Sequence, residues 1–95
     1  MESVALDTKK ALCIMQLTKD LPVLRARIRL SQEEVANRIG VTRQTYNAIE
    51  SQRRPMTWNT CVSLVTLFSS HEETKRMMRS NNYCYEVMEE IMCGR

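Results

Sequence analysis

Apolar residues recur every three or four positions along much of this chain, which is the period of a helix with one buried face. Near the N-terminus, Asp7 or Thr8 can cap a helix over residues 8–19. Its apolar face consists of Ala11, Ile14, Leu17 and Leu21, with Leu12 and Met15 beside it. This face is wide for so short a segment, so we expect part of it to pack on another subunit. Asp20 is predicted to break the helix, and Pro22 to begin the next one, which ends near Arg29.

The same pattern returns in the second half of the chain. Thr57 can cap a helix over residues 58–68 that is apolar nearly all round, which is typical of a central buried helix. Trp58 is expected to cover the core, with a role as a partner anchor as the alternative. The next helix begins after His71, a candidate cap, and has acidic residues first and basic residues last, as the helix dipole favours.

A last helix is predicted over residues 83–92. Its apolar stripe includes Val87, Met88, Ile91 and Met92, with Tyr83 at the rim. Adaptable methionines suit a subunit contact. Packing of this stripe onto the protein's own helices is an equally good interpretation, and both stay open.

Residues 31–51 carry the most specific pattern in the chain. Ser31 and Glu34 have capping-box spacing, so a helix begins here. Gly40 can take the left-handed conformation that ends a helix. Thr42 can cap a second helix almost at once. Two short helices joined by so tight a turn must cross steeply, and this arrangement is a helix-turn-helix.

The outward face of the second of these helices carries uncharged polar groups and arginine instead of Lys–Glu pairs. Arg43 suits a bidentate contact with guanine, Gln44 and Asn47 suit adenine, and Ala48 suits the thymine methyl group. The free N–H groups of the first turn favour a phosphate beside Thr42. Ordinary polar surface is the alternative interpretation of this face.

The segment LSQEEVANRIGVTRQTYNAIE resembles the DNA-binding domain of phage-repressor-like (Cro and C1-type) transcriptional regulators, often called the xenobiotic-response-element family. The matching residues are Leu30, Ser31, Gln32, Glu34, Ala36, Gly40, Val41, Thr42, Thr45, Ile49 and Glu50, followed by Arg54 and Pro55. The resemblance extends over about residues 21–68. It implies phosphate contacts for Gln32 and Thr42, base contacts for Arg43, Gln44 and Ala48, and a loop that lies against the DNA backbone with Arg53 and Arg54 as its cations. We add Arg38 and Thr45 as phosphate-contacting candidates.

Two residues depart from the pattern of this family. Gln52 stands where many relatives have glycine, and it would be strained at positive φ. Tyr46 replaces a smaller aliphatic residue, so its ring must be buried and its hydroxyl must find a partner.

Charge supports the DNA-binding interpretation. The net charge of +3 is mild, but residues 25–54 hold seven arginines and three glutamates, whereas the rest of the chain is slightly acidic. Cations clustered at the motif are typical of a phosphate-facing surface. Arg25 and Arg29 could reach the DNA backbone or lie on the helix surface.

Other classes of function find little support in the sequence. The four cysteines show no C-x-x-C spacing and no metal-like pairing with the single histidine, so neither a metal nor a cofactor is expected. Cys13 and Cys61 lie in apolar runs and are expected to be buried thiols. An enzyme is not predicted, because no nucleophile has an orienting base and no glycine-rich phosphate loop occurs. No pattern indicates a small-molecule effector, a signal peptide or a membrane span, so a cytoplasmic protein of a bacterium or phage is expected.

Together these patterns predict an all-α protein: a compact, lambda-repressor-like bundle of about five or six short helices. A single domain over residues 1–95 would have a core at 21–68, an N-terminal helix at 8–19 and C-terminal helices within 71–93. The predicted function is sequence-specific binding of duplex DNA as a transcriptional repressor, with residues 43–51 in the major groove. A homodimer on a palindromic operator would be held by the terminal helices, including Tyr83, Val87, Met88, Ile91 and Met92. The alternative is an antitoxin-like or adaptor protein that uses the same bundle to hold another protein.

Overall fold

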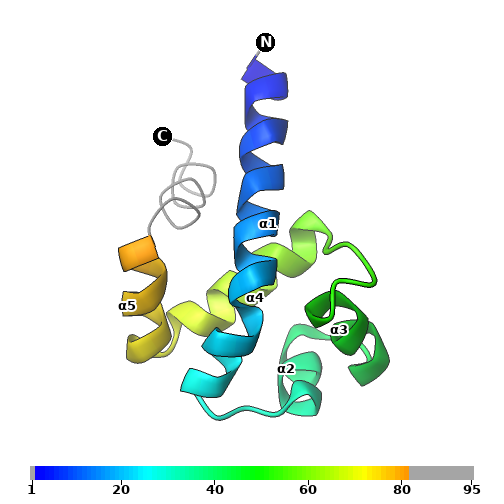
Figure 1. Ribbon diagram of the computed structural model, residues 1–95, viewed down its shortest axis with the longest axis vertical. Coiled ribbons are helices and arrows are strands. Elements are labelled where there is room, and N and C mark those ends of the chain that lie inside the picture. Colours follow the sequence, from blue (N-terminus) through cyan, green and yellow to red (C-terminus); the bar gives the residue numbers. More distant parts are fainter. Residues whose placement is uncertain (1, 82–95) are drawn as a thin grey trace.

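The computed structural model describes the backbone of residues 2–81 and the side chains of residues 7–80. This part of the chain contains helices and no strand, which confirms the predicted all-α fold (Figure 1). The helices are α1 (Glu2–Arg27), α2 (Gln32–Ile39), α3 (Arg43–Glu50), α4 (Trp58–Ser69) and α5 (Glu72–Asn81). The predicted helix over residues 83–92, with the dimer candidates Tyr83, Val87, Met88, Ile91 and Met92, lies outside the described residues.

α1 is one continuous helix, so the predicted break at Asp20 and the new start at Pro22 were wrong. Proline inside a helix removes a backbone hydrogen bond and costs about 3 kcal/mol. Burial offsets this cost, because Leu17, Leu21 and Leu24 are all at most 3% exposed and follow one face across the proline. Asp20 does not end the helix, since it accepts a hydrogen bond from Gln16 one turn earlier (3.0 Å).

The predicted apolar face of α1 also differs from the observed one. Cys13 is fully buried, whereas Ala11 is exposed, Leu12 is 40% exposed and Met15 is 56% exposed. The N-terminal half of α1 projects beyond the other helices (Figure 1). Leu12 and Met15 lie near the middle of α1, and the rest of the described chain does not cover them.

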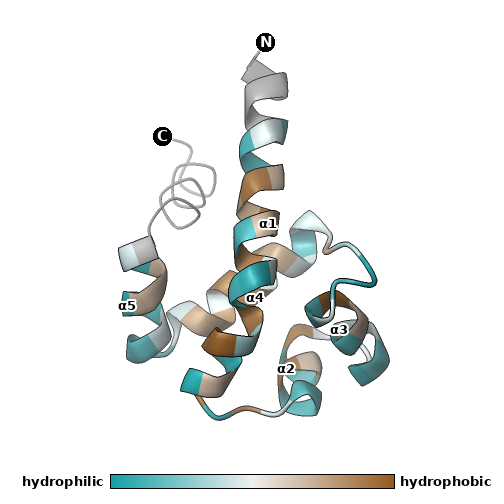
Figure 2. Cartoon of the chain, in the orientation of Figure 1, coloured by the Kyte–Doolittle hydropathy of each residue, from teal (hydrophilic) through white to brown (hydrophobic). Residues whose placement is uncertain are grey.

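α4 is the central helix of the core, as predicted. Its residues Cys61, Leu64, Val65 and Phe68 are buried. The helix contacts α1, α2 and α5, and Figure 2 shows that it is coloured mostly as hydrophobic where it passes behind α1. Thr57 caps α4 by accepting the Thr60 N–H at 3.2 Å. Trp58 is half-buried against the core, with the Lys10 ammonium 5.1 Å from its ring centroid, which supports the core-covering role.

α5 packs on α1 and α4, and it carries a buried polar residue. Thr74 is fully buried, and its hydroxyl donates to the carbonyl of Phe68. His71 precedes the helix and its carbonyl accepts the Lys75 N–H at 2.9 Å, so it occupies the cap position predicted for it. These contacts hold α5 on the side of α4 away from α3 (Figure 1).

Candidate nucleic-acid interface

The helix-turn-helix is built as its sequence predicts. Ser31 and Glu34 form both hydrogen bonds of a capping box at the start of α2. Gly40 ends α2 in the left-handed conformation with φ 82°. Thr42 then caps α3 by accepting the Thr45 N–H at 3.0 Å. The turn between the helices is therefore held by backbone geometry and caps, and α2 and α3 pack closely on each other.

α3 buries one face and exposes the other. Tyr46 and Ile49 are at most 2% exposed and belong to the core. Arg43 and Gln44 are exposed, and Thr45, Asn47 and Ala48 are half-buried. A shallow depression of about 310 Å³ is lined by Arg43, Gln44, Asn47, Ala48 and Arg53. The structure thus brings the four residues predicted to contact bases onto one accessible surface.

Glu50, the last residue of α3, accepts hydrogen bonds from several other side chains, and the sequence analysis did not identify this cluster. Arg25 of α1 donates from Nε and Nη2 to its two carboxylate oxygens, both at 2.9 Å. The Tyr46 hydroxyl donates to Oε1 at 2.8 Å, and Gln32 Nε2 of α2 donates to Oε2 at 3.0 Å. One carboxylate therefore connects α1, α2 and α3.

The electrostatics of this cluster favour the ionised carboxylate. Burial alone would raise the pKa of Glu50, but the hydrogen bonds from Arg25, Tyr46 and Gln32 lower it overall. The hydrogen bond to Glu50 raises the pKa of Arg25, and burial followed by the Glu50 contact raises the pKa of Tyr46. The hydroxyl of Tyr46 thus has the partner that its burial requires. Arg25 is committed to Glu50 and to the Leu30 carbonyl, which leaves it a structural role instead of a DNA contact.

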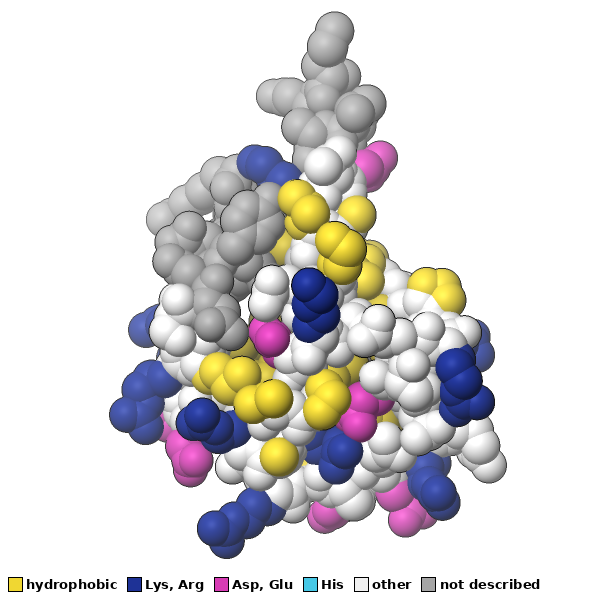
Figure 3. Space-filling model, in the orientation of Figure 1, with side chains coloured by type: hydrophobic (Ala, Val, Ile, Leu, Met, Phe, Trp, Pro, Cys, Tyr) yellow, Lys and Arg dark blue, Asp and Glu magenta, His cyan; other side chains and the backbone are white. Residues whose placement is uncertain are grey.

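The end of α3 passes into the arginine loop, which we define as residues 52–56. The carbonyl of Ala48 accepts the N–H groups of Arg53 and Arg54 at 2.9 and 3.1 Å. Gln52 has φ 65°, which confirms the positive φ expected at this position. Arg53 and Arg54 are exposed, as is Arg38 in the last turn of α2. The described surface thus carries exposed cations on both sides of the α2–α3 motif, and Figure 3 shows Lys and Arg side chains around the lower edge of the molecule.

Gln32 and Asn47 lie between these groups and contact each other. Asn47 Nδ2 donates to Gln32 Oε1 at 3.0 Å, and Asn47 Oδ1 accepts from Arg53 Nη2 at 2.7 Å. Gln32 is half-buried, and both ends of its carboxamide have protein partners. It is therefore less open to a phosphate than the resemblance implies.

Cys13 and Cys61 are buried thiols, as predicted, and burial, followed by the proximity of Cys13, raises the pKa of Cys61 to about 12. Within residues 7–80, no group of three or more His, Cys, Asp or Glu side chains is placed to hold a metal ion. None of the described helices is both long and apolar enough to cross a membrane.

The comparisons with known proteins agree with this geometry. Residues 24–57 match a protein-family model described as helix-turn-helix, a span that runs from the last turn of α1 to the cap of α4. No curated protein and no solved structure matched the chain. The match covers about a third of the chain, and together with the fold it supports a helix-turn-helix domain of the kind found in DNA-binding transcription regulators. Within this class, residues 24–57 are a phage-repressor-like motif of the Cro and C1 type.

Proposed function

We propose that the protein is a transcriptional repressor that binds duplex DNA sequence-specifically with α3 in the major groove. One observation supports this proposal most strongly. Arg43 and Gln44 are exposed on α3, whereas the opposite face of the same helix is buried in the core. The major groove offers a distinct pattern of donors and acceptors for each base pair, so exposed side chains on a rigid helix can select a sequence.

Each contact follows from the chemistry of the side chain. Arg43 reads guanine, Gln44 and Asn47 read adenine, and Ala48 contacts a thymine methyl group. Thr42, Thr45, Arg38, Arg53 and Arg54 hold phosphates and set the register without reading sequence. Thr42 and Thr45 already lie at the first turn of α3, where free N–H groups favour an anion.

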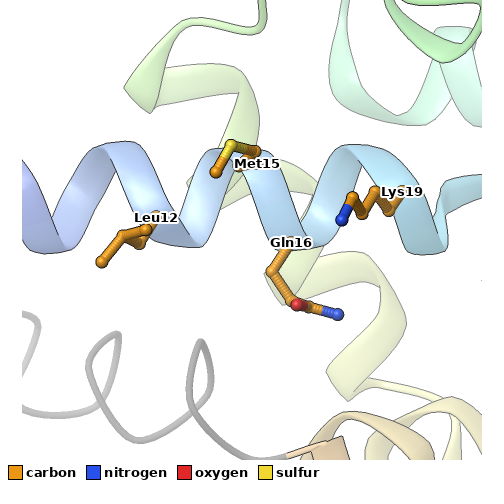
Figure 4. Close-up of a pocket in the computed structure, with 4 residues that line it drawn as sticks. All are labelled: Leu12, Met15, Gln16 and Lys19. Atoms are coloured by element: carbon orange, nitrogen blue, oxygen red, sulfur yellow. The ribbon is translucent and has the colours of Figure 1, made fainter.

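A homodimer makes this reading selective, because one eight-residue helix spans few base pairs. Two copies related by a two-fold axis present two such helices about 34–36 Å apart to a palindrome. The exposed apolar residues of α1, which include Leu12 and Met15, support a role for this helix in the subunit contact together with the C-terminal segment (Figure 4). A dimer bound at a promoter in the cytoplasm of a bacterium would block polymerase; this last step rests on family analogy.

Selection of bound duplexes from a random library, with the full chain as bait, tests the proposal. We expect an enriched palindrome whose half-sites lie about 10 base pairs apart, centre to centre. If no sequence is enriched, sequence-specific binding is contradicted. If only a single half-site is enriched, the dimer is contradicted.

The second candidate function is that of an antitoxin-like or adaptor module. The observation that favours it is the same exposed face of α1, where Leu12, Met15 and Val23 are 40–56% exposed. A gel shift on random duplex DNA separates the two candidates. A regulator shows weak, salt-sensitive binding to any sequence, whereas a pure adaptor shows none.

A further inference from the structure

A continuous series of side-chain hydrogen bonds connects the arginine loop with Glu50. Arg53 Nη2 donates to Asn47 Oδ1 (2.7 Å), and Asn47 Nδ2 donates to Gln32 Oε1 (3.0 Å). Gln32 Nε2 then donates to Glu50 Oε2 (3.0 Å). We call these four residues the amide chain. It crosses from the loop to α3, then to α2, and back to the end of α3.

The chemistry of its two ends gives the amide chain a single direction. A guanidinium group only donates hydrogen bonds, and an ionised carboxylate only accepts them. Each carboxamide between them has a donor at one side and an acceptor at the other. If the Gln32 carboxamide were flipped so that its O and N atoms exchanged places, its oxygen would face the Glu50 carboxylate. If the Asn47 carboxamide were flipped in the same way, its NH₂ group would face Arg53. Because Arg25 and Tyr46 also donate to Glu50, the acceptor end is secured independently of the two amides.

The direction of the chain determines what Asn47 offers to a base. After its two protein contacts, the carboxamide keeps one N–H on Nδ2 and one lone pair on Oδ1. Adenine presents an acceptor (N7) and a donor (N6) in a fixed order on its major-groove edge, which matches this remaining pair. A reversed carboxamide would exchange the donor and acceptor positions and lose that match. Asn47 lines the depression on the outer surface of α3, which is the surface that meets the bases in the proposed function.

We propose that Gln32 is a positioning residue that orients the Asn47 carboxamide through Glu50 and thereby determines which base Asn47 selects. The inference rests on the proposed function, because it assumes that Asn47 meets a base. It replaces the phosphate contact that the resemblance implies for Gln32. The two roles differ in their consequences, since a phosphate contact strengthens binding to every sequence and a positioning residue changes preference at one base pair.

The decisive experiment compares Gln32→Ala, Asn47→Ala and a matched control on duplexes that vary one base pair at a time. Asn47→Ala identifies the base pair that Asn47 reads, where the wild type should discriminate by roughly 5- to 150-fold. Gln32→Ala is expected to reduce that discrimination to about twofold, to keep the discrimination at the Arg43 base pair, and to keep affinity for random duplexes. The control is Thr66→Ala, which also loses one side-chain hydrogen bond but lies on α4 outside the motif, and it should change none of these values.

A measurement on the DNA-free wild type tests the amide chain without relying on a variant that folds. NMR should show nuclear Overhauser contacts between an Asn47 Nδ2 proton and the Gln32 side chain, as one fixed orientation of the carboxamide requires. Rapid exchange between two orientations of Asn47 would overturn the proposal, as would an equal loss of affinity for all sequences in Gln32→Ala. If Asn47→Ala alters preference at no base pair, the base contact in the proposed function has failed, and selection through Gln32 is overturned with it. The NMR signals would then still show whether Gln32 orients the amide.

Discussion

Glu50 is the point at which side chains of α1, α2 and α3 meet in one set of hydrogen bonds. Its side chain is only 9% exposed and accepts hydrogen bonds from Arg25, Tyr46 and Gln32. An ionised group is costly to bury unless its oxygens are paired. Because the partners come from three helices, the same contacts that satisfy the charge also hold α3 at its angle to α1 and α2.

We expect Glu50→Gln to destabilise the protein at neutral pH but to matter little in acid. The variant breaks a nearly buried ion pair, which costs on the order of 2 kcal/mol of unfolding free energy at pH 7. The folded-state pKa of Glu50 is lowered. Its stabilisation is therefore complete above the unfolded pKa of about 4.3 and is lost as the pH falls through the folded pKa.

Urea denaturation of the wild type and the variant at several pH values measures this difference. The gap in unfolding free energy should narrow as the pH falls below about 4. Glu73→Gln, on the exposed surface of α5, is the matched control and should shift stability little at any pH. A gap that stays constant down to acid would contradict the role assigned to the ionised carboxylate.

Gln52 is a residue at which stability can be gained. It occupies the left-handed conformation after α3, with hydrogen bonds from Gln52 N to Ile49 O and from Arg53 N to Ala48 O. A side chain in this conformation costs about 1–2 kcal/mol, whereas glycine costs more entropy on folding. We expect Gln52→Gly to stabilise the fold by about 0.5–1 kcal/mol, which thermal unfolding would show as a higher Tm.

Gly40→Ala is the opposite substitution, because it adds a side chain at a residue with positive φ, and it serves as the control. Gly40 has φ 82°, and a Cβ atom there would meet nothing within 4 Å, so only backbone strain is added. A loss of about 0.5–1 kcal/mol is expected. If Gln52→Gly lowers the Tm, the exposed Gln52 side chain makes a stabilising contact that outweighs the strain.

For single residues, the sequence predicted the backbone conformation and the need for a hydrogen-bond partner better than it predicted pairs of residues far apart in the chain. The positive φ of Gln52 and the need of Tyr46 for a partner followed from the type of residue at each position, and both were confirmed. The pairing of Arg25 with Glu50 was missed, because the two residues are 25 positions apart and meet only once α1 and α3 pack. Their opposite charges were visible in the sequence, but no spacing rule connects them.

Among the elements, α3 carries the functional proposal, and Arg43 tests it most directly. We expect Arg43→Ala to cost about 1–3 kcal/mol of binding free energy and to loosen preference at one base pair. Competition between duplexes that differ at single positions would measure this. Arg76→Ala, which removes an exposed arginine from α5, is the matched control. An equal loss at every sequence would mean that Arg43 touches only phosphate.

The helices show where sequence reasoning succeeds and where tertiary packing overrides it. The starts of α2, α3 and α4 depend on Ser31, Thr42 and Thr57, and the end of α2 depends on Gly40. Each of these local signals was confirmed. α1 was divided wrongly because Asp20 and Pro22 are strong local breaking signals. A buried face that continues from Leu17 through Leu24 outweighs them, and that gain is not visible until α4 is in place.

The molecule as a whole is small and carries its cations unevenly. Its principal extents are 39 × 27 × 19 Å, and seven of its fourteen Lys and Arg residues lie within residues 25–54. Of these seven, Arg25 is occupied by Glu50, whereas Arg38, Arg53 and Arg54 are exposed beside the motif. With one phosphate neutralised by each of these three exposed arginines, we expect three neutralised phosphates per subunit in the proposed complex.

The dependence of affinity on salt tests phosphate binding and subunit number together. Each neutralised phosphate releases counterions and contributes about −0.9 to the slope of log affinity against log salt concentration. A dimer with about six contacts should give a slope near −5, and a monomer a slope near −3. Arg54→Ala removes one contact per subunit and should make the dimer slope shallower by about 2, whereas Arg76→Ala should leave it unchanged. A slope near zero would contradict the phosphate assignment. A slope near −3, as expected for a single subunit, would contradict the dimer.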